Sequence, residues 1–329
     1  MNEYLWAAAG FGLLIVGAEA LVHGSVAVAK RLRVSPLLIG VTIVAYGTST
    51  PELIVSVNAA LSGNYGIAVG NVVGSNIFNI LLILALTAVI APITVSARAI
   101  GREGLFALIA AGLFIWLALE RGAHGALGFQ EGVLFLATLL AMILISYAQE
   151  SARATPADGS RFMRERPLVH SPVIDLGLIL VGLALLMVGA DVLVHSSIAI
   201  ARASGVSETM IGLTLVAAGT SLPELVTSVV AALRRNPDIA LGNIVGSNVY
   251  NILGILGVAS LIGPIHIDPE IIRIDMWVML AATLALFLPM LVGNRMGRGY
   301  GLLLLAGYAI YVAFLFQSAG VADFGLPFK

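Results

Sequence analysis

Two glutamates, Glu52 and Glu224, offer the clearest chemistry in this chain, because each stands alone in an apolar stretch and the two are 172 positions apart. Each completes the same pattern, Gly-Thr-Ser-x-Pro-Glu, at residues 47–52 and 219–224. On insertion scales an acid at the centre of a membrane helix costs roughly 2.5 to 3.5 kcal/mol. Acids retained at such depth mark ion or substrate pathways. The pair therefore predicts a functional site within the apolar part of the chain.

Oxygen-bearing side chains recur at fixed distances from both acids. In the segment after each glutamate, an asparagine, a serine and a second asparagine are spaced four residues apart, at residues 71, 75 and 79 and at residues 243, 247 and 251. This spacing places the three side chains on one helical face. The oxygens near the acids belong to Thr48, Ser49, Asn71, Ser75 and Asn79 in the first copy and to Thr220, Ser221, Asn243, Ser247 and Asn251 in the second. With no cysteine in the chain and no histidine in either copy, this set favours calcium or sodium, and magnesium less, over zinc or copper.

Pro51 and Pro223 are expected to break the helices that carry the glutamates, since proline cannot donate to the carbonyl four residues earlier. Freed backbone at membrane depth is tolerated only inside protein or beside a watery cavity. The carbonyls of Ala45 and Ala217, just before the breaks, are therefore further candidate ligands. The same residues also form a capping box with an early proline, which starts a helix. Both interpretations can hold, with capping fixing a carboxylate that also binds.

The asparagine and serine stripes have a structural alternative, in which they only hydrogen-bond one helix to another. Glycines precede the first two residues of each stripe, at Gly70 and Gly74 and at Gly242 and Gly246. Such spacing lets a neighbouring helix approach closely.

The composition places this chemistry in a membrane. Of 329 residues 59% are hydrophobic and 11% charged, whereas a soluble domain has about 25% charged residues. The apolar runs are continuous, which excludes the alternation of a transmembrane barrel, and they are long enough as helices to cross the bilayer. We expect an all-α polytopic membrane protein with ten transmembrane helices, at residues 5–28, 37–61, 67–90, 103–119, 130–148, 173–197, 209–233, 239–262, 275–292 and 300–317.

The two halves are copies that should face opposite sides. Residues 39–84 and 211–256 align without a gap and share 30 of 46 residues. With ten spans, 13 of the 17 basic residues lie in loops on one side, which the positive-inside rule assigns to the cytoplasm. The aligned loops change charge, from Leu-Ser-Gly-Asn at 61–64 to Leu-Arg-Arg-Asn at 233–236. Five helices per repeat require this inversion, which is common among secondary transporters.

The predicted organisation follows from these spans. Residues 1–148 form the first five-helix repeat with its motif at 39–84, residues 149–172 a cytoplasmic linker, and residues 173–329 the second repeat with its motif at 211–256. We expect a plasma (inner) membrane location with both termini extracytoplasmic.

The motifs, Gly-Thr-Ser-x-Pro-Glu followed by Gly-Asn-x-x-Gly-Ser-Asn-x-x-Asn, resemble the alpha repeats of the calcium/cation antiporter superfamily, and more narrowly prokaryotic sodium/calcium exchangers. The resemblance implies an inverted five-plus-five fold with broken helices at the ion site and alternating access, in which the first and sixth helices slide across a bundle. It implies that Glu52 and Glu224 are the central acids shared by calcium and sodium. Further oxygens would come from Thr48, Ser49, Ser75, Asn79, Thr220, Ser221, Ser247 and Asn251 and from the carbonyls of Ala45 and Ala217.

Asn251 departs from relatives that carry aspartate there, including the potassium-dependent branch. Two central carboxylates neutralise one calcium ion but are one charge short for three sodium ions. Potassium dependence and stoichiometry therefore stay open.

The resulting hypothesis is a secondary antiporter that exports calcium with an inward sodium gradient. A proton/calcium exchanger is the alternative, although hydroxyls beside each glutamate favour sodium. The inverted repeat disfavours a channel, and an intramembrane hydrolase would need a nucleophile with a base, or a metal-binding motif. We therefore expect no enzyme and no cofactor, with calcium, sodium and lipid as partners, and neither nucleic acid nor an obligatory protein partner.

Glu19 and Asp191 form a second acidic pair, each followed four residues later by a histidine, His23 or His195. An acid and an imidazole at this spacing can bond to each other. Local pairing or helix anchoring is the favoured interpretation, and a gating or proton-linked role is the alternative.

Overall fold

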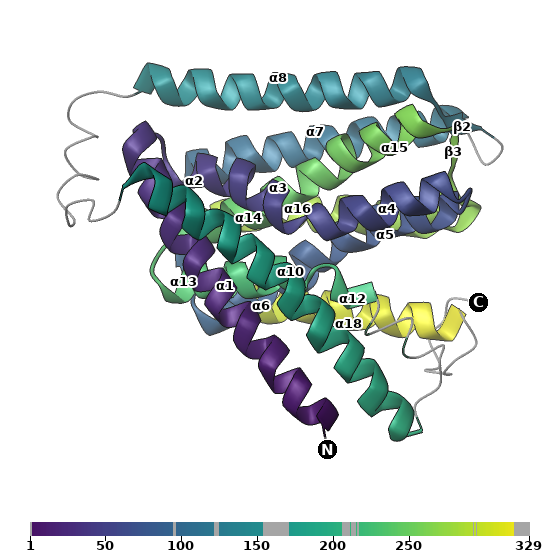
Figure 1. Cartoon of the computed structure of the whole chain (residues 1–329). Coiled ribbons are helices and arrows are strands. Elements are labelled where there is room, and N and C mark those ends of the chain that lie inside the picture. The colour runs from purple at the N-terminus through teal and green to yellow at the C-terminus, as the bar shows by residue number, and fades with distance from the viewer. Residues whose placement is uncertain are drawn as a thin grey trace.

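The computed structural model of the chain is almost entirely helical. It describes residues 2–94, 97–121, 125–153, 171–205, 211, 215, 217–291, 293 and 295–318. Figure 1 shows several helices running side by side, with α1 and α10 lying together obliquely to them. The long uninterrupted helices are α1 (Asn2–Leu32), α7 (Ala97–Arg121), α8 (Phe129–Arg153), α10 (Pro172–Ala203) and α18 (Arg298–Ser318).

Three other apolar segments, in addition to the first glutamate-bearing helix described next, contain π-helical turns, a feature found often at functional sites. Two of these segments carry the asparagine and serine stripes. The first consists of α5 (Tyr65–Phe78), η2 (Asn79–Leu84) and α6 (Ala85–Ile90), and the second of α14 (Pro237–Val249), η4 (Tyr250–Ile255) and α15 (Leu256–Ile262). The third consists of η5 (Ile271–Asp275), α16 (Met276–Ala285) and α17 (Leu288–Leu291).

The helices that carry the glutamates are broken, as the prolines predict. The first runs through α2 (Pro36–Ile39), η1 (Gly40–Val44) and α3 (Ala45–Thr48), and after Ser49 it resumes as α4 (Thr50–Leu61) with a bend of 48°. In the second half, α12 (Ala217–Gly219) is separated from α13 (Leu222–Leu233) by Thr220 and Ser221.

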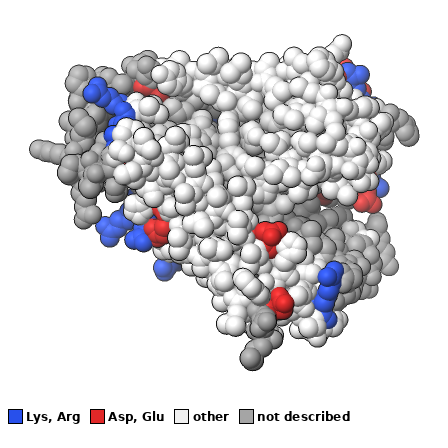
Figure 2. Space-filling model, in the orientation of Figure 1, with Lys and Arg blue, Asp and Glu red and all other residues white. Residues whose placement is uncertain are grey.

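Eight helices among the described residues are long and apolar enough to cross a membrane, or nine when Pro36–Thr48 and Thr50–Leu61 count as one bent span. All nine coincide with predicted spans, which confirms a polytopic helical protein. Figure 2 shows that the face of the protein seen in Figure 1 is largely uncharged, with acidic and basic side chains in small groups. The remaining predicted span, residues 209–233, is described continuously only from Ala217 onward. The count of ten therefore stays a prediction.

Two short two-stranded sheets join the first half of the chain to the second. Strand β1 (Ile93–Thr94) pairs with β4 (Arg295–Met296), and β2 (Ala126–Leu127) pairs with β3 (Ile265–His266), both antiparallel. The strands β1 and β3 occupy equivalent positions in the two copies, since 93 + 172 = 265, and each pairs with a strand of the other half. This exchange of partners agrees with an inverted repeat.

The second sheet also bears on the number of spans. Paired strands lie on the same side of a membrane, so an even number of crossings must separate β2 from β3. Between them the chain passes through α8, α10 and the α14–α15 segment, which supply three crossings. The segment that ends in α13 would supply the fourth, so the β2–β3 pairing supports the tenth predicted span.

Helices α1 and α10 pack antiparallel through facing glycines. A Cβ atom on Gly17 would lie 2.8 Å from the carbonyl oxygen of Gly182, and one on Gly24 would lie 2.7 Å from the carbonyl oxygen of Asp175. Small residues at this seven-residue spacing bring the two backbones together, as in many membrane helix pairs. At one end, Arg31 of α1 donates to the buried carboxylate of Asp175. Equivalent helices of the two copies thus run in opposite directions.

Candidate ion-binding site

The structure brings the two glutamates together through serines of the opposite copy. The hydroxyl of Ser49 donates to Glu224 Oε1 at 2.8 Å, and the hydroxyl of Ser221 donates to Glu52 Oε1 at 2.7 Å. Both carboxylates are 1% exposed. The helix breaks position these serines, because each lies where its helix is interrupted and not within a regular turn. Both halves therefore contribute to one buried, hydrogen-bonded centre.

Asparagines at the start of each stripe hold the glutamate-bearing helices in place. Asn71 donates from Nδ2 to the backbone carbonyl of Glu52 at 3.2 Å and to Ser56 Oγ at 2.9 Å. Asn243 makes the same two bonds, at the same distances, to the Glu224 carbonyl and to Ser228. The helix-to-helix interpretation is therefore correct for these two asparagines.

Several predicted ligands have oxygens that lack a partner although they are buried. Buried polar atoms without a hydrogen bond are costly and uncommon. Twelve such side-chain atoms occur among the described residues, and seven of them belong to the predicted set. The seven are Oε2 of Glu52, Oε2 of Glu224, Oγ1 of Thr220, Oγ of Ser247, Oδ1 of Asn79, and both Oδ1 and Nδ2 of Asn251. A transported cation would satisfy the oxygens in this group, so the donor set fits a hard cation.

The other hydroxyls of the set already have hydrogen-bond partners. Thr48 donates to Oδ1 of Asn243 at 3.0 Å, and Ser221 Oγ lies 3.4 Å from Ser75 Oγ. Their oxygens keep a second lone pair for a cation. Among the described residues, no group of three or more His, Cys, Asp or Glu side chains could hold a metal. Hydroxyls and amides must therefore complete any ion site around the two acids.

The expectation that the helix break frees the Ala45 carbonyl is wrong. This carbonyl accepts the backbone N–H of Ser49 at 3.0 Å and the Thr48 hydroxyl at 3.3 Å. The chain leaves the helix at Ser49, so the bond from Ser49 back to Ala45 survives. Ala217 opens α12, and the role of its carbonyl as a ligand stays a prediction.

Two asparagines that were not predicted as site residues join the halves beside the acids. Asn248 accepts a hydrogen bond from Asn79 Nδ2 at 2.9 Å and donates to the carbonyl of Asn76 at 3.3 Å. Asn76 and Asn248 are the asparagines of the duplicated Gly-Ser-Asn, so the repetition itself was a signal for them. The arrangement is not symmetric, because Asn251, the counterpart of Asn79, is fully buried and makes no such bond.

The glycine stripe behaves as predicted in the second half. A Cβ atom on Gly242 would lie 2.7 Å from the Leu37 carbonyl oxygen, and one on Gly246 would lie 2.6 Å from Val41 Cα. No described residue comes within 4 Å of the equivalent positions on Gly70 and Gly74. Their matching neighbours would be residues 209–217, most of which lie outside the described part. The prediction is therefore confirmed for one copy only.

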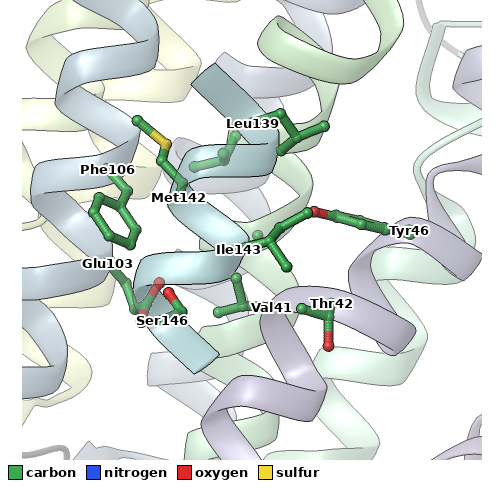
Figure 3. Close-up of a pocket in the computed structure, with 11 residues that line it drawn as sticks. Val41, Thr42, Tyr46, Glu103, Phe106, Leu139, Met142, Ile143 and Ser146 are labelled. Atoms are coloured by element: carbon green, nitrogen blue, oxygen red, sulfur yellow. The ribbon is translucent and has the colours of Figure 1, made fainter. Parts of the chain in front are cut away.

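A small cavity lies between η1, α7, α8 and α14, apart from the paired glutamates. Figure 3 shows apolar Phe106, Leu139 and Met142 along it and the polar side chains of Glu103 and Ser146 near one end. Its volume is about 10 Å³, room for no more than one water molecule. Glu103 already accepts a hydrogen bond from its neighbour Arg102. The cavity is thus a packing defect and not a second ligand site.

The second acidic pair is not part of this centre. Glu19 accepts hydrogen bonds from Arg234 Nε at 2.7 and 2.9 Å, and His23 Nδ1 lies 3.7 Å from its carboxylate. Asp191 is paired with His195 at 3.2 Å. Each histidine also places its Nδ1 2.9 Å from the backbone carbonyl oxygen of the acidic residue four positions earlier. Local contact is therefore observed in both pairs, whereas the carboxylate of Glu19 hydrogen-bonds to Arg234 in the turn after α13.

A polytopic helical protein with paired glutamates and converging oxygens in its interior belongs to the class of membrane cation transporters. The profile of the sodium/calcium exchanger protein family matches residues 3–148 and 174–317. The chain therefore belongs to the sodium/calcium exchanger family.

Named relatives are similar to this chain over most of its length. The putative antiporter CaxA of Alkalimonas amylolytica is 41% identical over 314 residues, which cover 94% of this chain and 97% of that protein. The sodium/calcium exchanger MaX1 of Methanosarcina acetivorans is 32% identical, with 93% and 96% covered. A solved structure of the sodium-calcium exchanger NCX_Mj superposes with a TM-score of 0.78 at 34% identity, covering 96% of this chain and 99% of that chain. These similarities support cation/calcium exchange.

Proposed function

We propose that the chain is an antiporter in which sodium entry drives calcium export across the plasma membrane. The observation that carries the proposal is the reciprocal bonding of Ser49 to Glu224 and of Ser221 to Glu52, which leaves one oxygen of each buried carboxylate without a partner. Calcium takes six to eight oxygen ligands, and carboxylates and hydroxyls also suit sodium. The ligands are the twelve residues predicted above, with the Ala45 carbonyl using its second lone pair.

Exchange of the two ions follows if calcium and sodium use the same two carboxylates. Calcium and sodium that need the same two carboxylates cannot be bound together, so release of one ion on one side permits binding of the other. The repeats 1–148 and 173–329 would present the site alternately to the two sides. The α1–α10 pair, held together by glycine contacts, is the element we expect to move as a unit. No catalytic step is needed in this cycle, and no protein partner is required.

Proteoliposomes separate sodium coupling from proton coupling. We expect purified protein to accumulate radiolabelled calcium when sodium is trapped inside and diluted outside, because outward sodium flux then exchanges for inward calcium. A proton gradient of the same size should give no uptake above that of protein-free liposomes. Uptake that follows protons and ignores sodium would instead support the alternative, a proton/calcium exchanger.

The proposed orientation can be tested in a chain that contains no cysteine. Ser62 and Arg235 are exposed and lie in the aligned turns after α4 and α13. In intact cells, a membrane-impermeant maleimide should label Ser62→Cys, whereas Arg235→Cys should react only after permeabilisation. Labelling of both from the same side would contradict the inverted repeat, and the reverse pattern would contradict extracytoplasmic termini.

A further inference from the structure

An ion pair joins α1 to the turn after α13. Arg234 donates from Nε to both carboxylate oxygens of Glu19, at 2.7 and 2.9 Å, and its Nη2 lies 2.6 Å from Oε1. Such forked contacts between arginine and a carboxylate are stronger and more directional than a single hydrogen bond. The side chains of Glu19 and Arg234 are 27% and 56% exposed, so the acid is largely shielded from water. The pair therefore holds α1 against the end of α13.

The face of α13 that leads from this arginine toward the ion site is covered. Thr227, Val230 and Arg234 are spaced three and four residues apart, which places them on one side of α13 and its C-terminal end. Thr227 is fully buried and Val230 is 8% exposed, and α1 packs against α13. Thr227 lies one helical turn beyond the site residue Glu224. The protein is therefore closed between the site and the turn after α13.

The equivalent face of α4 is uncovered. The counterparts of those three residues, 172 positions earlier, are Val55, Asn58 and Ser62, and all three are exposed. Val55 is 37% exposed, whereas its counterpart Thr227 is buried. Alternating access between inverted repeats exchanges the arrangements of the two copies. In the opposite conformation α10 would therefore cover α4, and α1 would leave α13.

The charges at the two ends do not exchange in the same way. Asp191 is the counterpart of Glu19, but the counterpart of Arg234 is Ser62. The carboxylate of Asp191 is 70% exposed and lies 3.2 Å from His195 of its own helix. When α10 covers α4, Asp191 would meet a serine where Glu19 meets an arginine. The inter-helix ion pair can therefore form in only one of the two conformations.

We propose that the Glu19–Arg234 ion pair is a one-sided latch, which stabilises the conformation closed at the turn after α13 and has no equivalent in the opposite conformation. The inference rests on the proposed alternating access and adds a contact that biases it. The α1–α10 pair is joined by its glycine contacts and by the bond of Arg31 to Asp175, so Glu19 and Asp191 move together. Movement of this pair away from α13 must break the latch.

Two cysteine reporters can follow the two conformations, because the chain contains no cysteine of its own. Val230→Cys should be shielded when α1 covers α13, and Asn58→Cys should be shielded when α10 covers α4. Each reporter is labelled with an uncharged maleimide in the purified full-length chain, without sodium or calcium. The rate at position 230 divided by the rate at position 58 then follows the ratio of the two conformations, whichever of them dominates.

Removing the latch should raise this ratio of labelling rates. Arg234→Ser gives the second copy the serine of the first, and Glu19→Gln removes the other charge of the pair. We expect either change to raise the ratio about two- to fivefold, as is typical for an exposed ion pair. Arg235→Ser is the matched control, since it removes the same charge from the next position of the same exposed turn, and it should leave the ratio unchanged. Reversing the pair, with Glu19→Arg and Arg234→Glu together, should restore the original ratio. An unchanged ratio in both single variants, or an equal rise in Arg235→Ser, would overturn the latch.

A mirrored latch tests the asymmetry directly. Ser62→Arg adds a positive charge to the turn after α4, so we expect it to pair with Asp191 and to raise the same ratio. Adding Asp191→Asn should cancel that rise. No rise in Ser62→Arg would show that Asp191 does not meet this turn, and would overturn the one-sided geometry. Labelling requires no transport, so the two proposals fail separately. Absence of sodium-driven calcium flux in liposomes would defeat the proposed function, whereas unchanged labelling ratios with normal flux would defeat only the latch.

Discussion

Replacing either central glutamate by glutamine is expected to abolish sodium-driven calcium transport. Glu52→Gln or Glu224→Gln keeps the size of the side chain but leaves a single carboxylate for a doubly charged ion. It also places an amide where the structure has a serine hydroxyl donating to a carboxylate oxygen. Removing one partner of a buried charge pair costs about 3 to 5 kcal/mol. At about 1.4 kcal/mol per tenfold, calcium affinity should fall by at least about a hundredfold.

The measurement is calcium flux in liposomes over a wide range of calcium concentrations, so that loss of affinity is separated from loss of turnover. Glu120→Gln is a matched control, since it makes the same change on an exposed residue near the end of α7. Its flux should equal that of the unmodified chain. Full activity in either of the buried variants would remove that glutamate from the site.

The broad architecture was predictable because apolar length and duplication are one-dimensional properties. Nine predicted spans coincide with helices, and the breaks lie beside Pro51 and Pro223 as expected. The shared location of the glutamates followed from duplication and charge inversion, which together predict one interface for two copies. Their reciprocal bonds to Ser49 and Ser221 add that each copy supplies the partner of the other's acid.

The backbone hydrogen bonds, π-helical turns and strand pairing depend on three-dimensional geometry that the spacing of residues in the sequence does not reveal. The Ala45 carbonyl was expected to be free because it lies just before the predicted break, whereas the chain leaves the helix at Ser49 and keeps the bond from Ser49 to Ala45. The π-helical turns that begin at Asn79 and Tyr250 rotate everything after them, and a strict helical period cannot anticipate this. The exchange of strand partners between halves is a long-range contact with no local signal.

The contact between α1 and α10 also escaped prediction, since its glycines are seven residues apart and isolated within long apolar runs. It nevertheless permits a decisive substitution. A Cβ atom on Gly182 would lie 2.6 Å from the backbone nitrogen of Leu21 and 2.8 Å from the carbonyl oxygen of Gly17. Backbone atoms cannot rotate away as a flexible side chain can. Gly182→Val must therefore push the two helices apart along their length.

We expect Gly182→Val to lose most of its folded protein and its transport. Overpacking typically costs about 1 to 3 kcal/mol and occasionally more, and a clash with backbone belongs at the upper end of that range. Gly177→Val is the matched control, because it introduces the same β-branched residue into the same helix at a position with nothing within 4 Å. Thermal unfolding in detergent, followed by the monodisperse fraction on size exclusion, should show a large fall in midpoint for Gly182→Val only. Equal midpoints for the two variants would mean that the helices do not approach at these glycines, and that the α1–α10 pair cannot act as the rigid moving unit of the transport cycle.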